Sequence, residues 1–120
     1  MNICKSSEDY LEMILMLSEE KGDVRSVDIA VRLQVSKPSV SYAMKQLREN
    51  GYILMDRDNY ISLTEKGMDI ADCMYKRHKG LIRFLTGIGV NEETAKKDAC
   101  RIEHDISNET FEAISRCAGE

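Results

Sequence analysis

The residues of this chain best suited to chemistry are Cys100, Glu103 and His104, near the end of the sequence. On a helix, positions i, i+3 and i+4 project from one face, so a thiolate, a carboxylate and an imidazole would lie together there. All three groups are ligands of divalent metal ions. The spacing therefore predicts half of a metal site, whose other half must come from elsewhere in the chain.

The composition limits the class of protein. A chain of 120 residues with 42% apolar and 32% charged side chains is long enough for one ordinary domain or two small helical units. We expect a cytoplasmic protein without a membrane partner, because the sequence lacks a bilayer-spanning apolar run and a signal-peptide pattern. Widely separated cysteines in a reducing cytosol predict free thiols or metal ligands rather than disulfides. The four cysteines are Cys4, Cys73, Cys100 and Cys117.

The charged residues are unevenly distributed. Residues 25–57 contain six basic and three acidic side chains, a net charge of +3, so the remainder of a chain with net charge −4 carries −7. The basic segment suits the phosphates of nucleic acid, and the acidic remainder suits cations. A bound metal ion would neutralise part of this acidity and favour approach to DNA.

The elements that must position these residues begin with two predicted helices. An apolar stripe at helical spacing, with Ser7 as its N-cap and Gly22 after its last turn, indicates the first. A second, shorter helix fits residues 26–33, with Ser26 as its cap. The buried residues should be Tyr10, Leu11, Ile14, Leu15 and Leu17 in the first helix, and Ile29, Ala30 and Leu33 in the second.

A third helix and a β-hairpin follow. Ser36 caps this helix, Pro38 lies in its first turn where a missing N–H costs nothing, and Asn50-Gly51 ends it. Val40, Met44 and Leu47 should be its buried residues. The β-rich segments 52–55 and 60–63 surround a polar turn. Short helix, tight turn, longer helix and hairpin together predict a winged helix-turn-helix.

Caps and glycines divide the second half into further helices. The fourth helix runs to His78, a short apolar helix covers residues 81–85, the sixth carries the metal half-site beside an apolar stripe over residues 95–106, and a seventh ends the chain. The predicted caps are Thr64, Asn91 and Ser107, and the predicted interruptions are at Lys79-Gly80 and at Gly87 to Gly89. The fold class is therefore mainly α: an N-terminal winged helix-turn-helix DNA-binding domain, residues 1–70, followed by a helical metal-binding and dimerisation domain, residues 71–120.

The solvent-facing side of the third helix would enter the major groove of DNA. Serine hydroxyls and the glutamine amide can hydrogen-bond to base edges or phosphates, and lysine and arginine suit phosphates. The alternative is a winged helix used only for contacts with proteins. The predicted DNA-binding residues are Arg25, Ser36, Lys37, Pro38, Ser39, Ser41, Tyr42, Lys45, Gln46 and, at the wing tip, Arg57.

In combination these motifs resemble the diphtheria-toxin-repressor family of metal-dependent regulators, nearest its short manganese-transport-regulator branch. The resemblance runs in order from Ser7 to Phe111 and so covers nearly the whole chain. It is carried by Glu8-Asp-Tyr-Leu-Glu12, Val27-Asp-Ile-Ala30, Val35-Ser36, Pro38-Ser-Val40, Leu63-Thr64, Lys66-Gly67, Arg77-His78, Cys100-Arg-Ile-Glu-His104 and Ser107.

The resemblance implies a metal site between the DNA-binding and dimerisation units. Its ligand positions are Asp9, Glu12, His78, Cys100, Glu103 and His104. At Cys100 the manganese branch has a glutamate that can bridge two ions, whereas the iron-sensing branch has a cysteine. That iron branch has methionine at Asp9 and no acid at Glu12, so the set is of mixed type. The ancillary site of the iron branch is not carried over, because Ile82 and Lys96 occupy two of its ligand positions, and the chain ends without that branch's SH3-like domain.

Six candidate ligands exceed the four of a structural zinc site and suit octahedral Mn²⁺ or Fe²⁺, or two ions that share a ligand. Carboxylates favour Mn²⁺, whereas imidazole and thiolate favour softer ions, so Co²⁺, Ni²⁺ and Zn²⁺ are further candidates in vitro. With two ions, either Glu103 or the Cys100 thiolate would bridge. The sequence leaves the choices between Mn²⁺ and Fe²⁺, and between one ion and two, open.

The expected function is a repressor that binds double-stranded operator DNA as a homodimer when the metal is bound, and controls genes of metal homeostasis. One alternative is a redox-sensing winged-helix regulator with Cys73, Cys100 or Cys117 as its switch. Another is a small metallohydrolase with Glu103 as base. Two features argue against an enzyme: the sequence has no Gly-rich or nucleophile motif, and the six candidate ligands would leave no open position on the metal. We also expect no small organic ligand.

Overall fold

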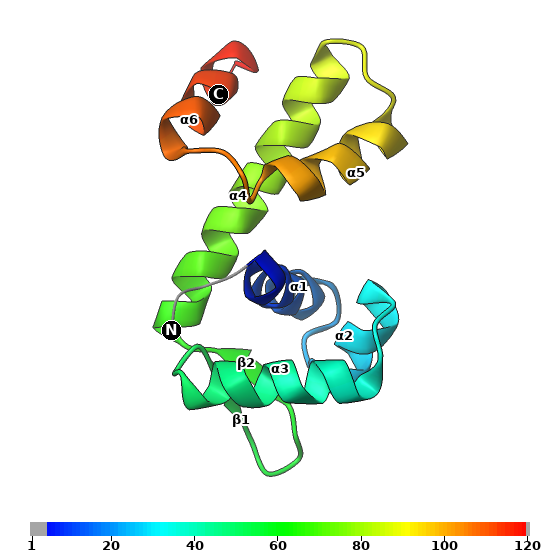
Figure 1. Ribbon diagram of the computed structural model, residues 1–120, viewed down its shortest axis with the longest axis vertical. Helices are drawn as coiled ribbons and strands as arrows, with labels where there is room; N and C mark the ends of the chain where they lie inside the picture. Colours follow the sequence, from blue (N-terminus) through cyan, green and yellow to red (C-terminus); the bar gives the residue numbers. More distant parts are fainter. Residues whose placement is uncertain (1–4, 120) are drawn as a thin grey trace. The chain divides into compact units, whose positions relative to one another are not determined.

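The computed structural model of the protein describes residues 5–119. Within that range it contains six helices and one two-stranded antiparallel sheet (Figure 1). The chain forms two compact units, residues 1–72 and 73–120. The predicted fold class, mainly α with an N-terminal winged helix-turn-helix, is confirmed. No helix among the described residues is both long and apolar enough to span a bilayer.

Three helices precede the hairpin in the first unit, and a fourth begins there. Apolar faces at helical spacing pack inward because burial removes them from water. The predicted core residues of these three helices are buried, except for Tyr10 and Leu33, which are half-buried. The elements are α1 (Lys5–Lys21), α2 (Ser26–Leu33), α3 (Lys37–Glu49), β1 (Ile53–Met55), β2 (Ile61–Leu63) and the start of α4 (Glu65–Gly87).

Four predicted helix caps are confirmed. In each, a side-chain oxygen accepts a hydrogen bond from a backbone N–H two or three residues later, which satisfies a donor that the helix leaves unpaired. The bonds run from Ser39 N to Ser36 Oγ (3.2 Å), from Gly67 N to Thr64 Oγ1 (3.2 Å), from Glu93 N to Asn91 Oδ1 (2.9 Å) and from Thr110 N to Ser107 Oγ (3.1 Å).

Two predicted caps are wrong. α1 already includes Lys5, so Ser7 lies inside the helix. At α2 the cap position is Arg25, whose backbone N–H donates to Asp28 Oδ2 at 2.9 Å. The carboxylate three residues into the helix thus supplies the local hydrogen bond that the prediction gave to the Ser26 hydroxyl.

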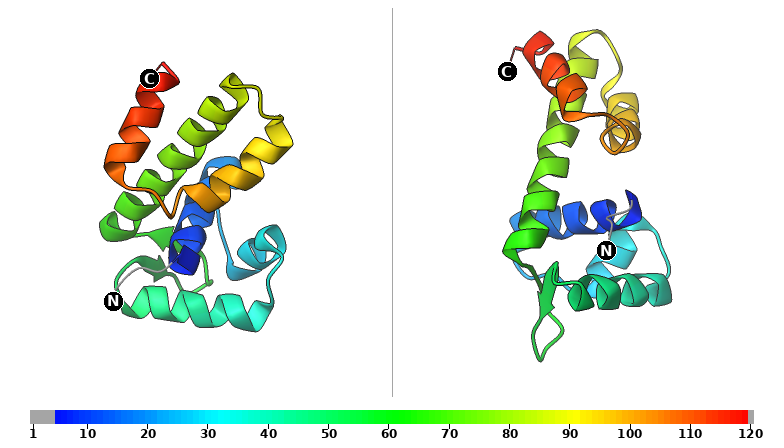
Figure 2. Two further views of the ribbon diagram at one scale, coloured as in Figure 1. Left: turned by 45° about the horizontal axis from the view of Figure 1, so that its top comes forward. Right: turned by 60° about the vertical axis from the view of Figure 1, so that its left-hand side comes forward.

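The β1–β2 hairpin forms the predicted wing. Its strands pair with Met55 opposite Ile61, and its turn is built by Asp56, whose Oδ1 accepts from the N–H groups of Asp58 and Tyr60, both at 2.9 Å. An aspartate that bonds to backbone ahead of it stabilises such a turn. The hairpin extends past α3 in Figure 1 and in the right-hand view of Figure 2.

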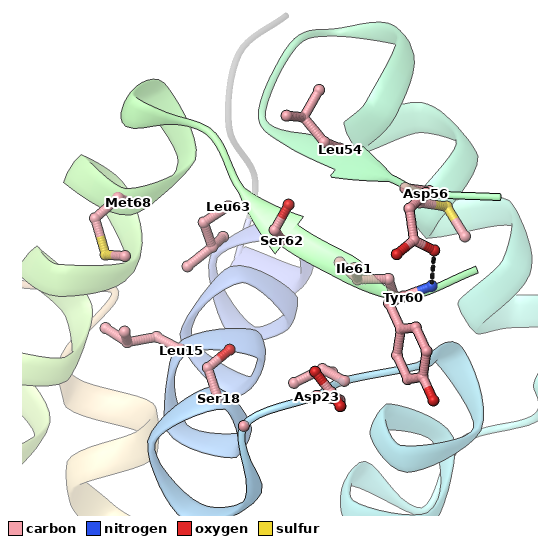
Figure 3. A pocket seen from close by; sticks show the side chains of 13 residues that line it. Leu15, Ser18, Asp23, Leu54, Asp56, Tyr60, Ile61, Ser62, Leu63 and Met68 are labelled. Atoms are coloured by element: carbon pink, nitrogen blue, oxygen red, sulfur yellow. Dashed lines mark hydrogen bonds between the residues drawn. The ribbon is translucent and has the colours of Figure 1, made fainter. Parts of the chain in front are cut away.

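A groove of about 720 Å³ lies beside the wing in the first unit (Figure 3). Leu15, Leu63 and Met68 line one side of it, and Asp23 and Asp56 lie toward the other. The lining includes none of the predicted metal ligands or DNA-binding residues.

The fourth and fifth predicted helices are one continuous helix, α4. The interruption predicted at Lys79-Gly80 is therefore wrong. One glycine inside a helix costs only about 1 kcal/mol relative to alanine. Burial of Met74 and Leu81, before and after Gly80, outweighs that cost.

In the second unit, α5 and α6 flank the later part of α4 (Figure 2). These helices are α5 (Glu92–Ile102) and α6 (Asn108–Cys117). α5 ends earlier than predicted: Glu103 is its C-cap with helical φ −58° and ψ −25°, and His104 lies in the turn that follows. The helix does not reach Ile106 because Ser107 caps the next one, so the chain must leave α5 first. A tight bond from Asp105 N to Ile102 O (2.9 Å) closes the turn.

Candidate metal centre

Three predicted ligands meet in the second unit. His78 comes from α4, Cys100 from α5 and Glu103 from the C-cap of α5, and their ligand atoms lie within 4.8 Å of one another. His78 Nδ1 is 3.2 Å from Glu103 Oε2 and 3.9 Å from Cys100 Sγ. The structure thus brings Cys100 and Glu103, at the end of α5, together with the imidazole of His78, which lies 22 residues before Cys100.

Glu103 is fully buried and presents its two carboxylate oxygens to two different imidazoles. Oε2 lies beside His78, and Oε1 lies 3.5 Å from His104 Nε2. The latter contact does not form a hydrogen bond, so Oε1 is buried without a hydrogen-bond partner in the described part of the chain. A buried carboxylate is costly without compensation. Carboxylate, imidazole and thiol donors, one of them an orphaned buried oxygen, fit a divalent metal ion.

The same neighbours perturb His78. The Cys100 sulfur and, second, the Glu103 carboxylate raise the pKa of His78 to about 10, against the opposing effect of burial. The imidazolium form is therefore favoured at neutral pH. Binding of a metal at His78 must displace that proton, so its apparent affinity falls as the pH falls.

Asp9 and Glu12, the other two predicted ligands, lie on α1 in the first unit. They are three residues apart and so share a helix face; Asp9 is half-buried and Glu12 is buried. Their assignment as ligands stays a prediction from the resemblance.

One residue of this region was given no role from the sequence. Arg77, beside His78, is buried and contacts the segment that carries Glu103 and His104. The Arg77-His78 pair was part of the resemblance, but no spacing rule predicts which backbone carbonyls a buried arginine contacts.

The sequence predicts free thiols or metal ligands rather than disulfides. Within the described residues Cys73, Cys100 and Cys117 are free thiols, and Cys4 lies outside those residues.

Most of the predicted DNA-binding residues lie at the start and along the outer side of α3, while Arg25 precedes α2 and Arg57 lies in the wing. All are exposed except Gln46, which is half-buried, and Tyr42 leaves 68% of its surface exposed. The Ser36 hydroxyl accepts from Ser39 N and lies 2.7 Å from Ser39 Oγ, so its first role is to cap α3. The Arg25 guanidinium stacks on the Tyr60 ring, 4.2 Å from its centroid, which holds this cation against the residue that precedes β2.

Two family models match the chain one after the other. The model of the iron dependent repressor, N-terminal DNA binding domain, matches residues 2–59. The model of the iron dependent repressor, metal binding and dimerisation domain, matches residues 64–120. The chain belongs to the iron dependent repressor family. The predicted resemblance to metal-dependent transcriptional regulators is therefore confirmed.

Individual relatives agree with this family. The chain is 40% identical over 107 residues to the transcriptional regulator MntR of Salmonella typhimurium, which covers 89% of this chain and 68% of that protein. A manganese-dependent transcriptional repressor in complex with manganese matches with a TM-score of 0.85 and 28% identity, over 94% of this chain and 52% of that one. ScaR with bound Zn²⁺ matches with a TM-score of 0.76 and 26% identity, over 94% and 53%.

The chain thus spans about half the length of these solved structures. The two family models give this chain a DNA-binding domain followed by a metal-binding and dimerisation domain. The redox-sensing alternative finds no support among these relatives.

Proposed function

We propose that this protein is a metal-dependent repressor that binds operator DNA as a homodimer and controls genes of metal homeostasis in the cytoplasm. Its DNA-binding domain would comprise residues 1–70, and its metal-binding and dimerisation domain residues 71–120. The proposed activity is regulatory and not enzymatic. The metal, when bound, supplies positive charge and a fixed arrangement of its ligands. Both favour the conformation that binds DNA over the conformation that does not.

One observation carries the proposal: Glu103 is fully buried, and its two oxygens face different imidazoles. A carboxylate with its oxygens directed to two sets of donors is suited to bridge two ions. His78 and Cys100 would serve on the Oε2 side, and His104 on the Oε1 side. Asp9 and Glu12 are proposed as further ligands because the resemblance places acids of matching type at both positions.

The donor set favours Mn²⁺ or Fe²⁺ as the physiological ion. The carboxylates Asp9, Glu12 and Glu103 suit Mn²⁺, while His78 and Cys100 suit the softer Fe²⁺. Cys100 Sγ and His78 Nδ1 are 3.9 Å apart, a spacing at which both would hold one ion, so we propose a direct ligand role for Cys100. A thiolate there would make this chain more tolerant of Fe²⁺, Co²⁺ and Zn²⁺ than a protein with a carboxylate at that position.

The DNA side of the proposal rests on α3 and the wing. Exposed hydroxyl, amide and basic groups on α3 would read the major groove, and Arg25 and Arg57 would contact phosphates. The homodimer would form through the second unit. In α6 no residue is buried, although Phe111 and Ile114 give the helix an apolar side that a second copy would cover.

Metal titrations of DNA binding test the proposal. We expect Mn²⁺ or Fe²⁺ to raise the affinity of the wild-type protein for its operator, and Glu12→Ala and His104→Ala to abolish that increase while the protein stays folded. Glu109→Ala, an exposed acid on α6, is the matched control and should respond to metal like the wild type. Bound-metal stoichiometry, measured across Mn²⁺, Fe²⁺, Co²⁺ and Zn²⁺, separates one ion from two.

A further inference from the structure

Arg77 is a buried cation that is next to His78 in the sequence and also contacts the backbone of Glu103, another predicted ligand. Arg77 lies on the part of α4 that belongs to the second unit, and only 8% of the residue is exposed. Nη1 donates to the carbonyl oxygens of Glu103 (3.0 Å) and Ile106 (2.8 Å), and Nη2 donates to Asn108 Oδ1. The Phe111 ring lies 5.8 Å from the guanidinium carbon.

These bonds end on the short segment between α5 and α6 and on the first residue of α6. Glu103 caps α5, so its carbonyl has no partner within the helix, and the guanidinium provides one. The positive charge also lies at the C-terminal end of α5, where the helix dipole favours a cation. The first residue of α6, Asn108, is bound by the same side chain. One arginine therefore fixes both ends of the turn that carries Glu103 and His104.

The geometry is specific to arginine. A planar fork with several N–H donors can reach two carbonyls and one amide oxygen at once, whereas lysine offers a single point charge. In the described part of the chain its hydrogen-bond partners are neutral oxygens, and its Nε is buried without a partner. A buried charge is costly unless hydrogen bonds compensate it, so these bonds are what keep the guanidinium in this position. Its clearest effect is on the position of the backbone at residues 103–106.

We propose that Arg77 is a positioning residue that sets the orientation of Glu103 and His104 toward the metal. The inference rests on the proposed metal-binding function of these two residues. Without Arg77, the cap of α5 and the following turn lose their shared anchor, while His78 and Cys100 stay fixed by α4 and α5. Removal of Arg77 should therefore weaken metal binding by Glu103 and His104 and leave binding by His78 and Cys100 in place. Changes to groups that orient metal ligands typically lower metal affinity by about 10–100-fold.

Cobalt(II) spectroscopy tests this on the full chain, with Arg77→Gln and Arg77→Lys compared to wild type. Arg101→Gln, an exposed arginine on α5, is the matched control. We expect both Arg77 variants to keep the near-ultraviolet band of a cysteine–cobalt bond but to change the visible d–d bands as carboxylate and imidazole ligation is lost. Their affinity for Mn²⁺, measured by calorimetry, should fall by about 10-fold or more, and the control should match wild type.

A purely structural role would lower the melting temperature of Arg77→Gln and leave the cobalt spectrum of the folded protein unchanged; that result overturns the proposal. If Arg77→Gln does not fold, Arg77→Lys, which keeps the charge but places its donors on a single nitrogen, decides by the same spectrum. Wild-type protein that binds neither Co²⁺ nor Mn²⁺ would instead contradict the proposed function itself, so the two failures are distinguishable.

Discussion

The first unit buries many large apolar side chains beside one carboxylate, Glu12, whereas the second buries few apolar side chains beside Arg77 and Glu103. Leu11, Ile14, Ile29, Met44 and Leu47 are all at most 1% exposed in the first unit. In the second unit, the fully buried large side chains of the described residues are Leu81 and the carboxylate Glu103, with Arg77 nearly buried as well. The two units therefore hold their structures by different means.

This difference suggests that the DNA-binding unit is stable by itself, whereas the stability of the second unit depends on what it binds. The first unit has an apolar core that does not depend on any ligand, as a domain that must present α3 and the wing requires. The second unit has small core residues, Ala95 and Ala99, and an α6 without a buried residue. Its order is thus open to control by a metal ion and by a second copy of the chain.

The largest effect should follow from a methyl group at Gly67. A Cβ there would overlap the backbone carbonyl oxygen of Tyr52, and neither group can move without disturbing the start of α4 and the strand that follows Tyr52. We expect Gly67→Ala to reduce the free energy of unfolding by about 3 kcal/mol. Gly87→Ala, where nothing lies within 4 Å, should be neutral or stabilising. Equal melting curves for the two variants would contradict the packing described for the first unit.

A comparable contrast should appear between two apolar truncations. Leu47→Ala opens a cavity in the first unit and should cost about 3 kcal/mol in urea unfolding. Ile114→Ala removes a half-buried side chain on α6 and should cost about 1 kcal/mol or less at low protein concentration. Its main effect should be on dimerisation, measured by analytical ultracentrifugation. An unfolding cost for Ile114→Ala as large as that for Leu47→Ala would remove the distinction between the cores.

Metal should stabilise the elements that carry its proposed ligands, which are the second unit and the face of α1 with Asp9 and Glu12. At a free Mn²⁺ concentration of 100 times Kd, binding adds about 2.7 kcal/mol to the free energy of unfolding. In hydrogen exchange, we expect slower exchange over residues 74–106 and in α1, and little change in α2 and α3. A chelator should reverse it. Uniform protection of both units, or none in the second, would count against metal control of that unit.

The smallest effect should be a pH dependence of the first unit. The hydrogen bond from Lys21 Nζ (2.8 Å) and then the Arg25 backbone N–H lower the pKa of Asp28 below 3.8. A lowered folded pKa means that Asp28 contributes stability above the unfolded pKa, which is lost as the pH falls through the folded pKa. The contribution of such a partly exposed pair is about 0.5 kcal/mol. Asp28→Asn should flatten the acid branch of stability against pH relative to Glu19→Gln, and an identical slope would refute this.

The fold could be predicted from the sequence where periodicity and caps agree. Val40, Met44 and Leu47 occur at helical spacing behind Ser36 and Pro38, and that combination leaves few alternatives. The errors lie where two local signals compete. Gly80 reads as a helix breaker, but burial around it keeps α4 continuous, and the extent of that burial is a tertiary property.

In the candidate site too, the part set by local sequence was predictable, and the part set by contacts between helices was not. Cys100, Glu103 and His104 could be found because their spacing is local, and His78 because it stands in a recognisable pair of residues. The orientation of Glu103 could not be predicted, because α5 ends at Ile102 and the turn after it is held by Arg77 from another helix. Spacing rules do not extend to contacts that depend on where a helix stops.

The central claim is that metal occupancy controls DNA affinity, and fluorescence anisotropy tests it most directly. The probe is a labelled duplex selected from a random pool by the Mn²⁺-loaded protein, and salt is held constant because phosphate contacts make affinity salt-dependent. The account predicts that Mn²⁺ or Fe²⁺ lowers the Kd at least about fivefold relative to chelator, and that His104→Ala removes this difference. The same Kd with metal and with chelator for the folded wild-type protein would contradict it.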